Sequence, residues 1–268
     1  MLKKALLAAS LALAAGCATV PITGRRQLSL VPESEMNSLA VTQYKQTLGT
    51  AKLSTNAAEV AQVRRVGQRI QAAVEQYFRQ QGQSSQLDGY QWEFNLINDP
   101  KTVNAWCMPG GKVVVYSGIL PLTRDDTGLA VVLGHEISHA VARHGAERMS
   151  DQLVAQGLST ALSTALSQNA TATNNIFLSA VGAGSQVGSQ VAMLAFSRRQ
   201  ESEADHLGLI FMAMAGYNPA AALPFWQRMA AQSQNSTPEF LSDHPADATR
   251  IADLQRLLPE AQKYYKPR

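Results

Sequence analysis

His135-Glu136-Ile137-Ser138-His139 is the most informative stretch of this sequence, because of the spacing of its two histidines. Four residues advance an α-helix by just over one turn and about 6 Å, so His135 and His139 leave one helix face and can share a metal ion. Glu136 then lies beside the ion without binding it, where a carboxylate can act as a general base. The pattern is typical of a zinc site that activates water.

The residues on either side of this motif are mostly apolar. Residues 129–133 precede it and residues 140–142 follow it, so the predicted helix is apolar around most of its circumference and should cross a hydrophobic core. Two histidines and a glutamate are costly in such a place unless something binds them. The sequence therefore favours a metal site over two structural core histidines.

A catalytic zinc ion usually has three protein ligands, so a third ligand must lie elsewhere in the chain. His144 is the first candidate, but on a continuing helix it points away from the two motif histidines. Glu201 is the better candidate, because it stands four residues before Asp205 on a second predicted helix. Asp205 could then accept the ring N–H of a zinc-bound histidine. Glu203 and His206 face other directions and are expected to be solvated side chains.

Three stretches together resemble a known family. They are residues 133–145 (Leu-Gly-His-Glu-Ile-Ser-His-Ala-Val-Ala-Arg-His-Gly), the Glu201-x-x-Ala-Asp205 element and the late Asp243-His-Pro245. They resemble the gluzincin zinc metallopeptidases of the HtpX, BepA and LoiP type, relatives of the CAAX prenyl endopeptidase, over roughly residues 20 to 258.

The resemblance implies a zincin-type peptidase domain in which Glu201 is the third metal ligand. It also places His244 and Arg250 near the metal. Spacing alone would not select His244, because a lone histidine before a proline in a loop is usually a surface residue.

The pattern along the chain predicts a mostly helical α+β protein with a small sheet. Helices are expected at 33–49, 56–80, 131–146, 219–231 and 246–258, with Thr123, Asp125 or Asp126 capping the third. A strand is expected at 92–97, and a hairpin at 103–107 and 112–116. By the resemblance, its segment Asn104, Ala105, Trp106 and Cys107 matches an edge strand beside the active-site helix.

That edge strand has a functional interpretation. A protease can bind its substrate as an added strand, because main-chain hydrogen bonds tolerate many sequences. An ordinary core hairpin agrees equally well with the sequence.

Residues 153–191 contain no acidic or basic side chain. They join the helix with two ligands to the helix with the third, so both of their ends must lie near the metal. We expect a flap-like insertion over the cleft of a single peptidase domain at 33–268, or else a disordered insertion.

Residues 1–16 are expected to be a lipoprotein signal peptide. Two lysines precede an apolar run at 5–15 that is too short to span a bilayer and ends at Ala14-Ala-Gly-Cys17. The small residues before Cys17 resemble a bacterial lipobox, whose cysteine is acylated. Ala14 stands where the commonest form has leucine, so ordinary cleavage near Cys17 is the alternative.

Lipidation of Cys17 would make residues 17–32 a tether to a membrane. Ala18 after the cysteine points to the inner leaflet of the outer membrane of a bacterial cell envelope, facing the periplasm. Removing residues 1–16 takes away two lysines and lowers the formal net charge from +3 to +1, so we expect no nucleic-acid partner. Cys107 would then be the single remaining thiol, and it is expected to be a buried small hydrophobe.

These observations predict a membrane-anchored zinc endopeptidase that cleaves unfolded or misassembled envelope proteins. It would hold one zinc ion per chain, with Glu136 as the base. By the resemblance, His244 and Arg250 would bind the oxyanion, and His244 could also reach the metal and keep the enzyme latent. Two alternatives are an envelope chaperone with a structural or quiescent zinc site and a zinc hydrolase acting on a different bond. Glu136 argues against the chaperone, because a structural site needs no base.

Overall fold

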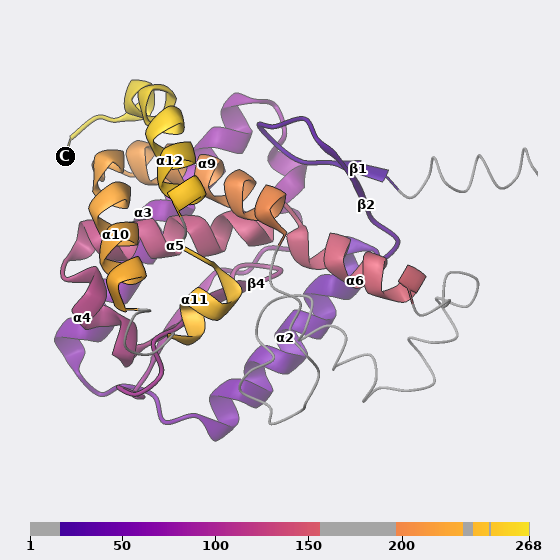
Figure 1. Ribbon diagram of the computed structural model, residues 1–268. Helices are drawn as coiled ribbons and strands as arrows, with labels where there is room; N and C mark the ends of the chain where they lie inside the picture. Colours follow the sequence, from indigo (N-terminus) through magenta and orange to yellow (C-terminus); the bar gives the residue numbers. More distant parts are fainter. Residues whose placement is uncertain (1–16, 156–196, 233–237, 247, 268) are drawn as a thin grey trace, which may run out of the picture.

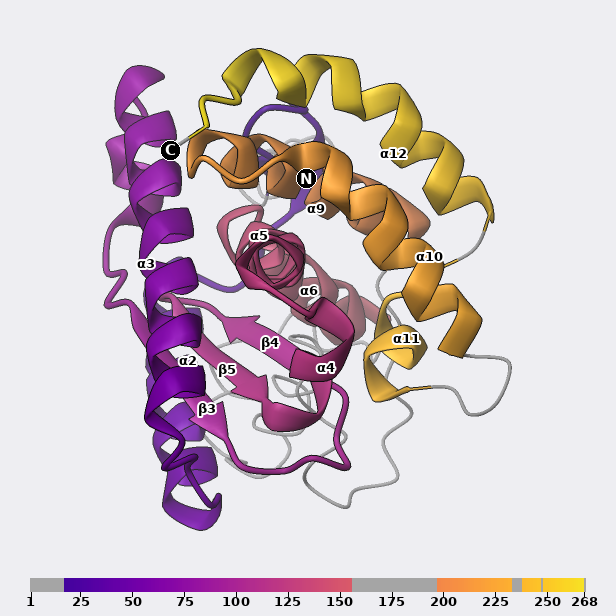
Figure 2. The same ribbon diagram turned by 90° about the vertical axis from the view of Figure 1, so that its left-hand side faces the viewer.

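The computed structural model describes residues 17–155, 197–232, 238–246 and 248–267. Its longest buried element is helix α5 (Asp126–Val141), which Figure 2 shows nearly end-on, between a sheet and a layer of helices. The predicted mostly helical α+β fold with a small sheet is confirmed. The other helices are α2 (Glu33–Thr50), α3 (Ala57–Gln80), α4 (Leu120–Thr123), α6 (His144–Ala155), α9 (Arg198–Met214), α10 (Ala222–Gln232), α11 (Glu239–Asp243) and α12 (Ala248–Ala261), with 3-10 turns at Ser84–Leu87, Ser117–Ile119, Pro219–Ala221 and Gln262–Tyr264.

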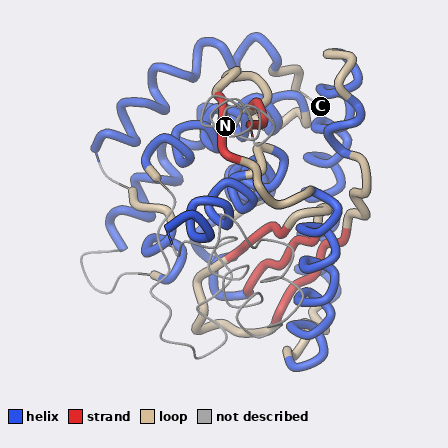
Figure 3. The backbone as a smooth tube through the Cα atoms, turned by 90° about the vertical axis from the view of Figure 1, so that its right-hand side faces the viewer, coloured by secondary structure: helices blue, strands red, loops and turns tan. Residues whose placement is uncertain are grey.

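The main sheet has three strands in the order β3-β5-β4 (Figure 3). Strand β3 (Glu93–Ile97) runs parallel to β5 (Lys112–Tyr116), and β4 (Ala105–Met108) pairs antiparallel with β5 as the predicted hairpin. Its turn contains Gly110 and Gly111, both with the positive φ that favours glycine. One face of the sheet packs in the core with α3 and α5, and α2 covers the other face.

Helix α5 begins where the side chain of Asp125 accepts the backbone N–H of Gly128 at 2.8 Å, so Asp125 is the cap. Every residue from Gly128 to Val141 is buried, as expected for a helix that crosses the core. Helix α9 crosses α5 very closely: a Cβ atom on Gly134 would lie 3.0 Å from the carbonyl oxygen of Gly208. Two glycines therefore allow the backbones of α5 and α9 to pack in direct contact. This contact places Glu201 and Asp205 of α9 beside the histidines of α5.

The predicted helix at 131–146 is wrong at its end. Helix α5 stops at Val141, and Arg143 has a left-handed backbone with φ 59 before α6 begins. The side-chain amide of Gln27 donates to the carbonyl oxygen of Ala142 at 2.9 Å and so stabilises the break. His144 consequently starts a new helix with a different direction.

Residues 17–28 are folded onto the protein, which differs from the predicted tether at 17–32. Strands β1 (Cys17–Thr19) and β2 (Arg26–Leu28) pair antiparallel, and we call residues 17–28 the N-terminal hairpin. Figure 1 shows it beside α6, and Val20 within it is 1% exposed. The tether prediction failed because small and polar residues here make specific tertiary contacts.

Two predicted segments lie outside the described residues: the signal peptide at 1–16 and, apart from the end of α6, the insertion at 153–191. Among the helices that the structure describes, none combines the length and the apolar character required to cross a membrane.

Candidate active site

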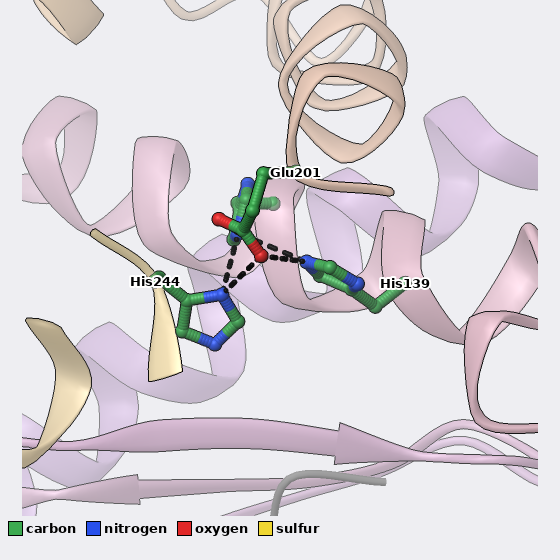
Figure 4. Close-up of side chains that lie close together, drawn as sticks. His139, Glu201 and His244 are labelled. Atoms are coloured by element: carbon green, nitrogen blue, oxygen red, sulfur yellow. Dashed lines mark hydrogen bonds and ion pairs between the residues drawn. The ribbon is translucent and has the colours of Figure 1, made fainter. Parts of the chain in front are cut away.

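Helices α5 and α9 bring the three predicted metal ligands together. The Nε2 atoms of His135 and His139 are 3.0 Å apart, so both imidazoles aim at one point. Glu201 reaches that point from α9, with Oε1 3.3 Å from Nε2 of His139 and Oε2 3.5 Å from Nε2 of His135. Figure 4 shows its carboxylate between the rings of His139 and His244.

His244 supplies a fourth nitrogen from the loop after α11. Its Nδ1 atom lies 2.9 Å from Oε1 of Glu201 and 3.1 Å from Nε2 of His135. The ligand atoms of all four buried residues lie within 4.8 Å of one another. Four ligands in a tetrahedron around a zinc ion stand about 3.3 Å apart, so this donor set fits a metal of that size.

Glu136 is buried beside the cluster. Its Oε1 atom has no hydrogen-bond partner among the described residues and lies 3.4 Å from Nε2 of His244. Burial raises the pKa of Glu136, although the neighbouring His244 and His135 oppose this. An unbonded carboxylate oxygen with a raised pKa at this position is suited to taking a proton from water.

Asp205 and Arg250 form hydrogen bonds to the ligand residues His135 and Glu201. Oδ1 of Asp205 lies 2.9 Å from Nδ1 of His135, as the sequence predicted for a partner of a metal-bound histidine. Arg250 donates to both carboxylates, with Nε 2.8 Å from Oδ2 of Asp205 and Nη1 2.9 Å from Oε2 of Glu201. Its guanidinium carbon lies 3.3 Å from the centroid of the buried Trp226 ring.

These contacts favour the ionised form of both carboxylates. Burial would raise the pKa of Glu201, but His244 and Arg250 hold it well below its usual range. Burial would likewise raise the pKa of Asp205, and Arg250 and His135 lower it. Arg250 is thus engaged with Glu201 and Asp205 in this structure. Its expected contact with an oxyanion stays a prediction, as does that of His244.

Two expectations for neighbouring residues were wrong. His144 does not point away from the motif: because the chain breaks before α6, its Nδ1 lies 3.0 Å from Nδ1 of His139. Glu203 is not a solvated carboxylate, since it is 6% exposed and its Oε2 lies 3.3 Å from Nε2 of His144. Burial raises the pKa of Glu203, but hydrogen bonds from His144, Thr23 and Arg25 lower it to about 2. His206 is partly exposed and pairs with Glu260 on α12, 2.9 Å away.

The predicted edge strand lies next to α5. Strand β4 is at the edge of the sheet, and its residues together with Asn104 are buried. Just before it, the carbonyl oxygen of Val103 accepts the backbone N–H of Phe240 at 3.1 Å. Cys107 is buried, as expected, and burial raises the pKa of its thiol far above the usual value. Substrate binding along residues 104–107 stays a prediction.

Comparison with known sequences gives the family. The profile of peptidase family M48 matches residues 65–258, which include both helices of the metal cluster and His244. The chain belongs to peptidase family M48. The resemblance seen in the three sequence motifs is thereby confirmed, and the polypeptide-hydrolysing character of M48 agrees with the donor set in this site.

Several M48 relatives carry names that describe their activity. The mitochondrial metalloendopeptidase OMA1 of Saccharomyces cerevisiae is 37% identical over 190 residues, which cover 68% of this chain and 52% of the yeast protein. The human metalloendopeptidase OMA1 is 28% identical over 91% of this chain and 46% of its own length. The beta-barrel assembly-enhancing protease of Escherichia coli is 31% identical over 61% of this chain and 34% of its length. This chain therefore spans about half or less of these three relatives.

Proposed function

We propose that this protein is a zinc-dependent endopeptidase. The observation that carries the proposal is the buried cluster of His135, His139 and Glu201 with the unbonded oxygen of Glu136 beside it. Two nitrogens and one carboxylate are a typical catalytic zinc set. M48 relatives named as metalloendopeptidases and as a protease support the same reaction.

The mechanism follows from what each side chain does. Bound zinc supplies Lewis acidity, which polarises a peptide carbonyl and makes a water molecule more acidic. Glu136 accepts the proton of that water and passes it to the departing amine. His135 keeps its Nε2 atom toward the other ligand atoms because Asp205 faces its Nδ1 atom.

His244 has two roles in this proposal. In the described arrangement its Nδ1 lies among the ligand atoms, where it occupies the place that water needs. When its side chain turns away from the cluster, the imidazole can stabilise the oxyanion of the attacked carbonyl. The same residue thus restrains the site and then assists it.

Substrate and location extend the proposal. We infer that the substrates are unfolded or misassembled polypeptides of a bacterial cell envelope, and that acylation of Cys17 anchors the chain to the outer membrane. The lysines, apolar run and small residues at 1–17 support the anchor. The name of the beta-barrel assembly-enhancing protease supports misassembled polypeptides as the substrate class, because that protein is named for the assembly of beta-barrels.

The test uses the purified full chain and unfolded casein. We expect about one zinc ion per chain, cleavage of casein, loss of cleavage with a chelator and recovery when zinc is restored. Glu201→Ala should bind zinc much more weakly, because it removes the one carboxylate among the four ligand residues. Cleavage at the same rate in the presence of the chelator would contradict the proposal, and a zinc-bound protein that never cleaves would favour the chaperone alternative.

A further inference from the structure

A second hydrogen-bond chain leads away from the metal cluster on the His139 side. From Nδ1 of His139 it runs 3.0 Å to Nδ1 of His144, and from Nε2 of His144 it runs 3.3 Å to Oε2 of Glu203. His144 is completely buried, so its polar atoms have to be satisfied within the protein. Neither His144 nor Glu203 has a role in the mechanism described above.

Metal binding would fix the direction of each hydrogen bond. With a metal ion on Nε2 of His139, which faces the other ligand atoms, the ring proton would be on Nδ1, and Nδ1 would donate. Nδ1 of His144 must then accept, and the proton of His144 resides on Nε2, which donates to the carboxylate of Glu203. The chain thus selects one tautomer at both histidines, which is how partners of metal-bound histidines orient them.

The N-terminal hairpin holds the far end of this chain. Oγ1 of Thr23 donates to Oε1 of Glu203 at 2.6 Å, and Nε of Arg25 donates to Oε2 at 2.7 Å. Nη2 of Arg25 also lies 2.8 Å from Oε2 of Glu147, and the amide of Gln200 donates to that same oxygen at 2.7 Å. The N-terminal hairpin therefore binds α9 through Glu203, the last residue of this series of hydrogen bonds, and binds α6 through Glu147.

The two motif histidines are supported in parallel ways. Asp205 lies on Nδ1 of His135 and is fixed by Arg250 from α12. Glu203 does not contact His139 directly, because His144 lies between them. Arg25 of the N-terminal hairpin holds Glu203 in place. Two carboxylates on α9, each clamped by a distant arginine, thus orient two imidazoles on α5.

We propose that His144 and Glu203 are positioning residues for the metal ligand His139, and that Thr23 and Arg25 of the N-terminal hairpin hold Glu203 in the orientation this requires. The N-terminal hairpin is then part of the metal site, although it lies more than a hundred positions before the ligand in sequence. The inference rests on the proposed metal site, and it predicts metal affinity in addition to activity.

The experiment measures zinc affinity of the full chain by competition with a chelator, and the absorption spectrum of the cobalt-substituted protein. Glu203→Gln keeps the size of the side chain but removes its charge, and His144→Ala removes the link. Both should bind zinc about 10- to 100-fold more weakly and change the cobalt spectrum. Arg25→Ala should weaken binding by less, because Thr23 still contacts Glu203.

Three further variants make the result specific. Arg26→Ala removes an exposed charge from the same N-terminal hairpin and should leave zinc affinity unchanged. Glu260→Gln removes the charge of an acidic side chain that lies outside this series of hydrogen bonds, and it should also leave zinc affinity unchanged. His144→Asn places an amide oxygen where Nδ1 accepts, so it should retain more affinity than His144→Ala. Circular dichroism and the melting temperature of each metal-free variant show whether it folds.

Folded Glu203→Gln and His144→Ala variants with the zinc affinity and cobalt spectrum of the wild type would overturn the proposal. Equal losses in His144→Asn and His144→Ala would assign the effect to packing and would also overturn it. A wild-type protein that binds zinc but cleaves nothing would refute the peptidase proposal alone, because the affinity comparison does not depend on catalysis.

Discussion

His244 joins two parts of the site through its two ring nitrogens. Nδ1 lies among the ligand atoms, 2.9 Å from Oε1 of Glu201, and Nε2 lies 3.4 Å from Oε1 of Glu136. A neutral imidazole is an ordinary zinc ligand, so this geometry can fill the fourth position of a tetrahedral site. We therefore propose that the same residue controls whether water reaches the base.

We predict that His244→Ala keeps its zinc and cleaves unfolded casein faster than the wild type. Three ligands remain to hold the metal, and the fourth position is then free for water. Zinc content and the initial rate of casein cleavage are the two measurements. A loss of about 100-fold in rate would instead make oxyanion binding the dominant role. An unchanged rate together with an unchanged metal environment would show that His244 has neither role.

Spacing in the sequence was sufficient to place three ligands and one supporting residue at the site. Glu201 and Asp205 stand four apart on one helix, as His135 and His139 do, and the structure joins the two pairs. His144 and Glu203 were missed because their environment depends on a helix break and on a distant hairpin. A histidine one residue after the left-handed Arg143 gives no local signal of its direction.

At the level of elements, the crossing of α5 and α9 sets the distance between the ligands. Cβ atoms added at Gly134 or Gly208 would meet backbone atoms of the other helix at 3.0 Å. Backbone at such a contact cannot move aside as a flexible side chain does, so a larger residue must push the helices apart.

We predict that Gly208→Ala destabilises the protein by about 1–3 kcal/mol and weakens zinc binding, because the added methyl group separates Glu201 from the two histidines. Chemical denaturation of the metal-free protein and chelator competition measure the two effects. Gly49→Ala is the matched control, since this helical glycine in α2 has nothing within 4 Å of an added Cβ. A stable Gly208→Ala variant with wild-type zinc affinity would contradict this account of the crossing.

The apolar periodicity of α3 and the turn of the β4–β5 hairpin predicted those elements closely, and α2 lies where the sequence predicted a helix. The end of α5 was predicted wrongly, because apolar residues continue through Ala142 and contain no glycine or proline that would announce a break. Gln27, more than a hundred residues earlier, binds the carbonyl oxygen of Ala142 at the break. Contacts of that sequence separation are not visible in a local pattern.

On the scale of the whole molecule, the N-terminal hairpin connects the predicted membrane anchor at Cys17 to helix α9, which carries the ligand Glu201. Cys17 opens strand β1, and Arg25 in the same hairpin reaches Glu203 on α9. An anchored chain would therefore hold its active site close to the membrane without a long linker. The sequence had suggested a tether here because it shows small, polar and turn-forming residues but not their partners.

We predict that Cys17→Ser alters the location of the protein. In a bacterial host the wild type should sediment with membranes and partition into detergent, while the variant should be released or remain unprocessed. Membrane fractionation and mass spectrometry of the mature N-terminus provide the measurements. A wild-type protein that is fully released into the periplasm without an acyl group would refute the anchor and leave the peptidase site untouched.

We propose that Glu136 is the base of this zinc endopeptidase. Glu136→Gln has the same shape and lies beside the cluster without binding to it, but an amide cannot accept the proton. The decisive measurement is the rate of casein cleavage by this variant with its zinc content determined on the same sample. We predict that this variant holds as much zinc as the wild type and cleaves at a rate lowered by at least about 100-fold. Zinc-loaded Glu136→Gln that cleaves casein at the wild-type rate would contradict it.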